Sequence, residues 1–205
     1  MLIHLLLGFS FLLHIALGLN DNPIEIEMNK DIPAPSKSSA MAEAELTSII
    51  KRYTEYNHWA NEQFAEWLST ASEEQLNQEI ESSFSSLKET VLHIWSAEYL
   101  WLQTVKDQSS QNNPAKSFAG KKEALLEGWL QASQNFRDHV QGMTASALEA
   151  KRSRGDRVTT IADMIHHCMN HSTYHRGQLI TMGRQAGLQD PPRTDFIYYV
   201  SLERE

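Results

Sequence analysis

The sequence has only one cysteine, Cys168, among its 205 residues. A single cysteine excludes a disulfide within the chain. Cys168 lies inside an apolar pattern of helical spacing, where a free thiol behaves as a small hydrophobic group. We therefore interpret Cys168 as a core residue.

Basic residues are also scarce. The chain has 18 lysines and arginines against 26 acidic residues, which gives a formal net charge of -8. An acidic chain repels a phosphate backbone, and binding to nucleic acid requires a basic surface that this composition does not supply. We expect no nucleic-acid partner and no gel shift with DNA at physiological salt.

Long apolar runs are absent after the first 19 residues. The run from Leu2 to Leu19 lacks lysine and arginine, and three interpretations stay open: an export signal ending near Gly18, a membrane anchor, or a wrongly assigned start with translation beginning at Met41 or Met28. The length of the run, at the lower limit for a span, and His14 count against the anchor. Residues 1–40 are expected to be this leader plus a disordered linker, and residues 41–205 the folded domain. The domain would be cytoplasmic with a start near Met41 and exported with a genuine signal, and we expect no stable membrane insertion of the domain.

Sustained alternation of the strand kind is missing as well, so we expect an all-α fold. Apolar residues instead recur at steps of three and four in four segments, which begin near Glu43, after Ser86, near Lys121 and after Thr160. Ser86 and Thr160 have the side chains typical of helix N-caps. A tail after Gly187 contains two prolines and several aromatic residues and should pack back on the helices. The sequence predicts a four-helix bundle.

Three histidines of the last segment follow one another at four-residue steps: His167, His171 and His175. Imidazoles one helical turn apart can reach the same metal ion. His171 and His175 share the apolar stripe that faces the bundle interior, whereas His167 is rotated toward its edge. The pattern favours His171 and His175 as a ligand pair, but hydrogen-bonded core histidines would show the same spacing.

A third ligand must come from another helix, and His93 is the candidate. It lies among apolar residues of the second segment, where an unpaired polar ring is costly to bury. This segment is apolar over a wide arc, so periodicity leaves the direction of His93 open. A Glu-x-x-His element at Glu55 and His58 resembles half of a di-iron site, but a second copy is missing, so we expect no di-iron centre.

Several motifs together resemble the DinB, or damage-inducible B, family over roughly Met41 to Val200. The motifs are Tyr56-Asn57-His58-Trp59-Ala60-Asn61, Leu92-His93-Ile94-Trp95-Ser96-Ala97-Glu98-Tyr99-Leu100-Trp101, Asn170-His171-Ser172-Thr173-Tyr174-His175-Arg176-Gly177-Gln178 and Thr194-Asp195-Phe196-Ile197-Tyr198. The resemblance implies a bundle with a long connection and a metal held by His93, His171 and His175.

Three neutral histidines leave a tetrahedral ion one open position for water or a thiolate. The resemblance implies an enzyme that activates a small thiol for transfer to an electrophilic small molecule, and water could take the place of the thiol. The metal would be a divalent ion, zinc or nickel before iron, with a low-molecular-weight thiol as co-substrate. The alternative is a non-catalytic, metal-stabilised homodimer acting as an interaction or stress-response module, which exposed tryptophans would support.

Residues around these histidines receive simpler interpretations. Arg176 is expected in a surface salt bridge rather than on a substrate carboxylate, and Glu98 as a solvated side chain. Gly177 would allow a neighbouring helix to approach closely. Trp95, Trp101 and Tyr174 are expected to shape the cleft. Asn57, Asn61 and Gln178 are expected to hydrogen-bond across the bundle without a chemical role.

Overall fold

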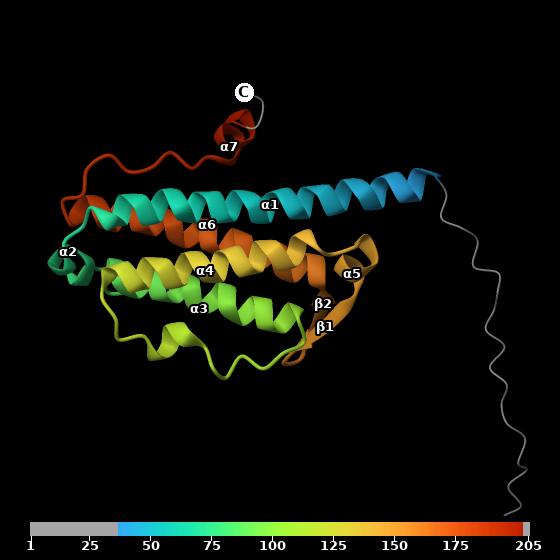
Figure 1. The fold of residues 1–205 in the computed structure, drawn as a ribbon, viewed down its shortest axis with the longest axis horizontal. Coiled ribbons are helices and arrows are strands. Elements are labelled where there is room, and N and C mark those ends of the chain that lie inside the picture. Colours follow the sequence, from blue (N-terminus) through green and yellow to red (C-terminus); the bar gives the residue numbers. More distant parts are fainter. Residues whose placement is uncertain (1–36, 203–205) are drawn as a thin grey trace, which may run out of the picture. The chain divides into compact units, whose positions relative to one another are not determined.

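A computed structural model describes residues 37–202 (Figure 1). The apolar leader and most of the expected linker lie outside the described residues. The first helix, α1, already begins at Lys37, so Lys37 to Ala40 are helical. Among residues 37–202, every helix is too short or too polar to cross a membrane.

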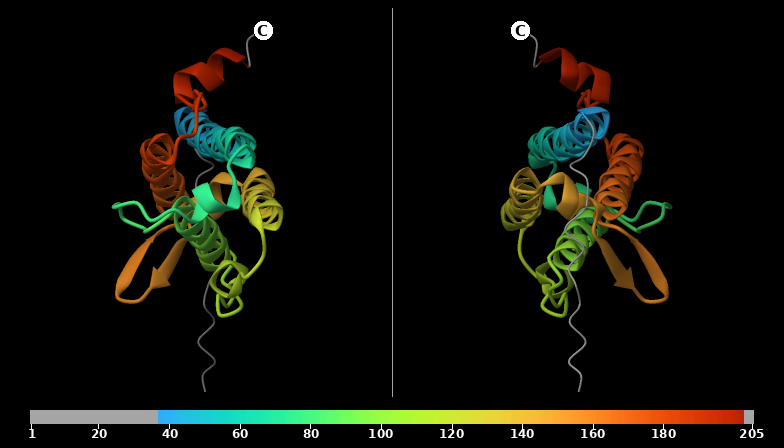
Figure 2. Two further views of the ribbon diagram at one scale, coloured as in Figure 1. Left: turned by 90° about the vertical axis from the view of Figure 1, so that its left-hand side faces the viewer. Right: turned by 90° about the vertical axis from the view of Figure 1, so that its right-hand side faces the viewer.

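Four long helices form the bundle and confirm the all-α prediction (Figures 1 and 2). They are α1 (Lys37–Ser69), α3 (Leu87–Val105), α4 (Lys122–Gln141) and α6 (Ile161–Gln185). Helix α1 packs against α4 and α6, and α3 packs against the same two helices. Short elements connect or follow them: α2 (Glu73–Asn77), η1 (Pro114–Ser117), α5 (Ala145–Glu149), β1 (Lys151–Arg154), β2 (Arg157–Thr160) and α7 (Phe196–Leu202).

Two helix starts lie where side-chain caps were predicted. The Ser86 hydroxyl accepts a hydrogen bond from the Glu89 backbone N–H at 3.2 Å, and the Thr160 hydroxyl accepts one from the Asp163 N–H at 3.1 Å. These bonds satisfy backbone donors that the first turn of a helix leaves unpaired. They fix the starts of α3 and α6, the two helices that carry the predicted ligands.

The hairpin of β1 and β2 was not predicted. Its register pairs Arg154 with Arg157 across a two-residue turn, in which Gly155 adopts a φ of 59°. Glycine occupies this left-handed region without the steric cost that a side chain brings. Each strand has four residues, and alternation over so short a stretch does not stand out from helical patterns.

The bundle core consists of two apolar clusters with a polar layer between them. One cluster contains Phe64, Leu68 and Trp129, and the other contains Ile165 and Cys168, which is fully buried as predicted. Between them, all four long helices contribute buried polar residues, namely Asn57, Asn61, Glu98, Ser133, Ser172, His175 and Arg176. Polar groups buried at such a level must satisfy one another.

The tail packs back on α1, as predicted. The Tyr56 hydroxyl donates to the carbonyl of Thr194 at 2.7 Å, and the ring of Phe196 meets the ring of Tyr56 edge-on at 5.1 Å. Nearer the bundle end, the Trp67 indole N–H donates to the carbonyl of Gln189 at 2.6 Å. Aromatic edges and backbone hydrogen bonds thus hold residues 189–199 on the first helix.

Candidate metal centre

Helices α3 and α6 bring His93, His171 and His175 together. The Nε2 atom of His171 lies 3.0 Å from Nε2 of His93 and 3.2 Å from Nε2 of His175. One ring nitrogen from each residue falls within 4.8 Å of the others, and these are the atoms that could hold a metal ion. Imidazole nitrogens bound to one zinc-like ion at about 2.0–2.1 Å lie roughly 3 Å apart. The donor set therefore has the spacing that a single ion requires.

All three rings favour the neutral form, in which a ring nitrogen offers a lone pair. Burial, reinforced by the neighbouring His175, lowers the pKa of His93 to about 4. The pKa of His171 is also lowered to about 4, by burial and then by the adjacent histidines. Burial lowers the pKa of His175 as well. Neutral imidazole is the ligand form of histidine.

Gln178 orients His175 from one turn further along α6. The Gln178 Oε1 atom lies 2.7 Å from Nδ1 of His175, and its amide nitrogen donates to the Ser83 hydroxyl at 2.7 Å. A carbonyl oxygen can only accept, so the proton of His175 resides on Nδ1 and the Nε2 lone pair points to the other histidines. Such a second hydrogen bond is what fixes the tautomer of metal-binding histidines. Gln178 was predicted to make cross-bundle contacts only.

The connection between α2 and α3 covers the outer side of the cluster. The Phe84 ring stacks on the His93 ring with centroids 4.1 Å apart. On α6, the exposed ring of Tyr174 meets His175 edge-on at 5.0 Å. The Nδ1 atom of His171 is buried and has no hydrogen-bond partner among residues 37–202. His171 is therefore oriented by its Nε2 neighbours and by packing.

His167 stays outside the cluster. Its side chain is exposed, and its ring centroid lies 6.0 Å from that of His171 and 4.9 Å from the Trp101 ring. The structure thus joins the two histidines that shared the apolar stripe and leaves out the third. It also gives His93 the direction that its own helix left open.

The polar layer corrects two interpretations. Arg176 is 2% exposed and makes no surface salt bridge; its Nη1 donates to Oδ1 of Asn57 at 2.6 Å and to Oδ1 of Asn61 at 2.8 Å. Glu98 is fully buried rather than solvated, and its Oε1 accepts from both asparagines and from Ser172. Burial raises the pKa of Glu98 and lowers that of Arg176. The asparagines hydrogen-bond across the bundle as predicted.

Three further interpretations were wrong. A Cβ atom added to Gly177 would meet nothing within 4 Å, so this glycine makes no close helix contact. Trp95 is buried and packs on Phe118 at 5.5 Å, within the apolar core and not in a cleft. None of the five tryptophans is exposed, which removes that support for an interaction module.

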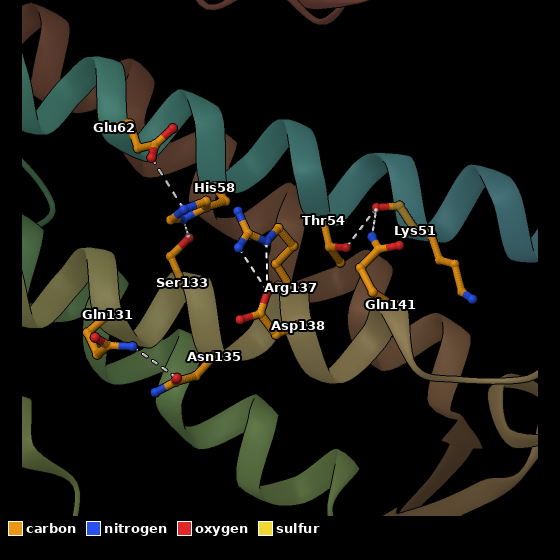
Figure 3. Close-up of polar contacts among 10 residues, drawn as sticks. All are labelled: Lys51, Thr54, His58, Glu62, Gln131, Ser133, Asn135, Arg137, Asp138 and Gln141. Atoms are coloured by element: carbon orange, nitrogen blue, oxygen red, sulfur yellow. Dashed lines mark hydrogen bonds and ion pairs between the residues drawn. The ribbon is translucent and has the colours of Figure 1, made fainter.

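Glu55 and His58 contribute nothing to the cluster. His58 faces α4, where its Nδ1 lies 3.2 Å from the Ser133 hydroxyl, and its Nε2 lies 3.4 Å from a carboxylate oxygen of Glu62 (Figure 3). Burial lowers the pKa of His58. His58 is therefore part of the contact between α1 and α4.

Comparisons with known proteins identify the family and agree with the fold. The model of the DinB family matches residues 41–205. Protein DinB of Bacillus subtilis strain 168 is 29% identical over 164 residues, which cover 73% of this chain and 92% of the relative. A DinB-like protein from Bacillus cereus superposes with a TM-score of 0.52 at 22% identity, over 65% of this chain and 89% of its own. Another, from Bacillus subtilis, gives 0.53 at 15% identity, over 74% and 97%. The chain belongs to the DinB family.

Proposed function

We propose that His93, His171 and His175 bind one divalent metal ion, and that the domain is a metal-dependent enzyme acting on small molecules. The observation that carries the proposal is the convergence of three Nε2 atoms at separations of 3.0 and 3.2 Å. The Gln178 contact to His175 Nδ1 supports it, because it presents the remaining lone pair to the cluster.

Three nitrogen ligands are typical of catalytic rather than structural metal sites. When bound, the ion would supply Lewis-acid chemistry and lower the pKa of a thiol or a water molecule. The chain's own residues set the conditions for that chemistry. Gln178 holds His175 in one tautomer, Phe84 shields the His93 ring from water, and the buried polar layer keeps α6 in register with α1 and α3.

The substrate class follows from the resemblance to thiol-dependent transferases. We propose a low-molecular-weight thiol as the nucleophile and an electrophilic small molecule as the acceptor. Zinc or nickel suits a site of three imidazoles, with iron as the next choice. Hydrolysis, with water in place of the thiol, uses the same residues.

Metal analysis of untagged protein tests the first half of the proposal. Protein purified without a metal column should contain about one divalent ion per chain, and a chelator should lower its melting temperature. The His175→Ala variant should lose the ion, whereas His167→Ala, one of the same α6 series, should keep it. Absence of metal from the wild type, or loss of the metal in the His167→Ala variant alone, would contradict the assignment of His93, His171 and His175 as ligands.

A measurement of enzymatic turnover tests the second half of the proposal, that the domain is an enzyme. The metal-loaded protein should consume a thiol and an electrophile together in a screen of small thiols, and His171→Ala should abolish the reaction. A chelator-sensitive melting temperature with no turnover for any thiol or for water would favour the alternative, a metal-stabilised dimeric module in a stress response. Size-exclusion chromatography with light scattering then measures whether the chain forms the homodimer that this alternative needs.

A further inference from the structure

A groove of about 520 Å³ lies between α3, α6 and the hairpin, and one of its lining residues, His167, neighbours His171 of the cluster. Its lining includes Trp101 of α3, Asp163 and His167 of α6, and Arg154, Arg157 and Val158 of the hairpin. The hairpin and the α2–α3 connection project from the same side of the bundle (Figure 2), but at opposite ends of its long axis (Figure 1). The histidine cluster and the groove are therefore separated along α3 and α6.

The hairpin concentrates positive charge in an acidic chain. Four of the seven residues from Lys151 to Arg157 are basic, although the whole chain carries a formal charge of -8. The register places Arg154 directly opposite Arg157, and like charges in that relation destabilise a strand pair. Within residues 37–202, neither guanidinium has a carboxylate oxygen within 4.0 Å. A bound anion would relieve this repulsion.

The rest of the lining combines an aromatic and apolar surface with polar side chains. The Arg154 guanidinium lies over the Trp101 ring, 4.6 Å from its centroid. Val158 is 63% exposed and also lines the groove. The carboxylate in the groove, Asp163, is already used, since the hydroxyls of Thr159 and Thr160 donate to it. The groove thus combines an aromatic surface with two arginines that have no carboxylate partner among residues 37–202.

His167 connects the groove to the cluster. Its ring contacts Trp101 on one side and faces His171 on the other, with centroid separations of 4.9 and 6.0 Å. Asp163, His167 and His171 succeed one another at four-residue steps, and each step advances about 6 Å along a helix. A molecule held by the hairpin arginines would reach the histidines if it measured roughly 6–12 Å.

We propose that this groove binds the anionic end of the substrate, and that the substrate is a small, flat, unsaturated or aromatic carboxylate. Arg154 and Arg157 hold the carboxylate, Trp101 contacts the planar body, and the far end reaches the histidine cluster. Guanidinium groups match the geometry of carboxylates, which gives the site both affinity and direction. The inference deepens the proposed function, on which its catalytic meaning rests; the binding itself is independent of metal.

Binding of cinnamate and of its neutral amide, cinnamamide, tests the inference. Both molecules are flat and of the required length, but only cinnamate carries a charge. In calorimetry with the full-length protein as purified, cinnamate should bind about tenfold or more tightly than cinnamamide, as charge-assisted hydrogen bonds predict. The double variant Arg154→Gln, Arg157→Gln should lose that preference, while its metal content stays that of the wild type and its melting temperature does not fall, because the change removes the repulsion between the two arginines.

The control variant Lys121→Gln, Arg184→Gln removes the same charge from two exposed residues that do not line the groove, and should bind cinnamate as the wild type does. Equal affinity for cinnamate and cinnamamide, or an unchanged preference in the hairpin variant, would overturn the inference. So would hairpin-dependent binding of duplex DNA at physiological salt in place of cinnamate binding. Cinnamate binding by a metal-free wild type would support the groove while refuting the metal proposal, so the two failures are distinguishable.

Discussion

Glu98 and Arg176 are both buried but have no direct ion pair, because Asn57 and Asn61 lie between them. Each asparagine donates its amide nitrogen to Glu98 Oε1 and accepts from Arg176 Nη1 through its oxygen. The opposite charges are therefore connected through two amide groups. These hydrogen bonds link α1, α3 and α6 next to the cluster of His93, His171 and His175.

Replacing Arg176 by methionine should destabilise the fold strongly. The substitution leaves the two asparagine oxygens without their donor and Glu98 without its nearest cation. Removing one partner of a buried ionic network costs about 3–5 kcal/mol. Urea unfolding measures the loss. The matched change Arg184→Met, at an exposed position of the same helix, should alter the free energy of unfolding by less than about 0.5 kcal/mol; equal effects at both positions would contradict the role of the layer.

Gln178→Ala should weaken metal binding without removing a ligand. The variant frees His175 Nδ1 from its acceptor, so the ring loses its fixed tautomer and orientation. Loss of such a contact lowers metal affinity roughly 10- to 100-fold. Competition with a chromophoric chelator measures this affinity. Thr181→Ala, an exposed change one turn away, serves as the control and should leave affinity unchanged.

Two glycines of α6 should respond in opposite ways to alanine. A Cβ at Gly183 would lie 2.2 Å from the Trp67 ring, and overpacking of this kind costs about 1–3 kcal/mol. A Cβ at Gly177 meets nothing within 4 Å, and alanine in a helix interior is favoured over glycine by roughly 0.5–1 kcal/mol. Thermal unfolding should show a lower melting temperature for Gly183→Ala and a higher one for Gly177→Ala. Stabilisation by both would show that Trp67 moves aside freely.

The start of α6 should contribute a pH-dependent stability. Hydrogen bonds from the hydroxyls of Thr160 and Thr159 lower the native pKa of the Asp163 carboxyl below its unfolded value. A lowered native pKa stabilises the fold above the unfolded pKa of about 3.9, and the contribution disappears as pH falls through the native value. The stability difference between wild type and Asp163→Asn should therefore shrink between about pH 5 and pH 2. A constant difference across this range would assign the effect to something other than ionisation.

The sequence predicted those parts of the site that one helix determines. His171 and His175 share a face of α6 because their spacing matches the helical turn, and that relation is independent of tertiary packing. The direction of His93 depends on how α3 rotates against α6, so its own apolar neighbours left it open. The residues alone made His93 the candidate third ligand, and the family resemblance implied its direction before the structure did.

Burial of Glu98 and Arg176 could not be read from their own segments. Charged residues on helices are usually exposed, and they are buried here because another helix satisfies them. A signal was nevertheless present: Asn57 and Asn61 lie one turn apart amid apolar residues of α1, and buried asparagines require partners. The hairpin was missed for a different reason, since four-residue strands carry too little periodicity.

The α2–α3 connection has consequences for how this protein can change over generations. Ser83 and Phe84 belong to an irregular segment, yet one binds the amide that orients His175 and the other covers His93. Irregular segments accept substitutions and insertions that packed helices reject. Mutation there can alter the orientation and the cover of the histidine cluster while every helix keeps its packing, so the surroundings of the cluster can change without loss of stability.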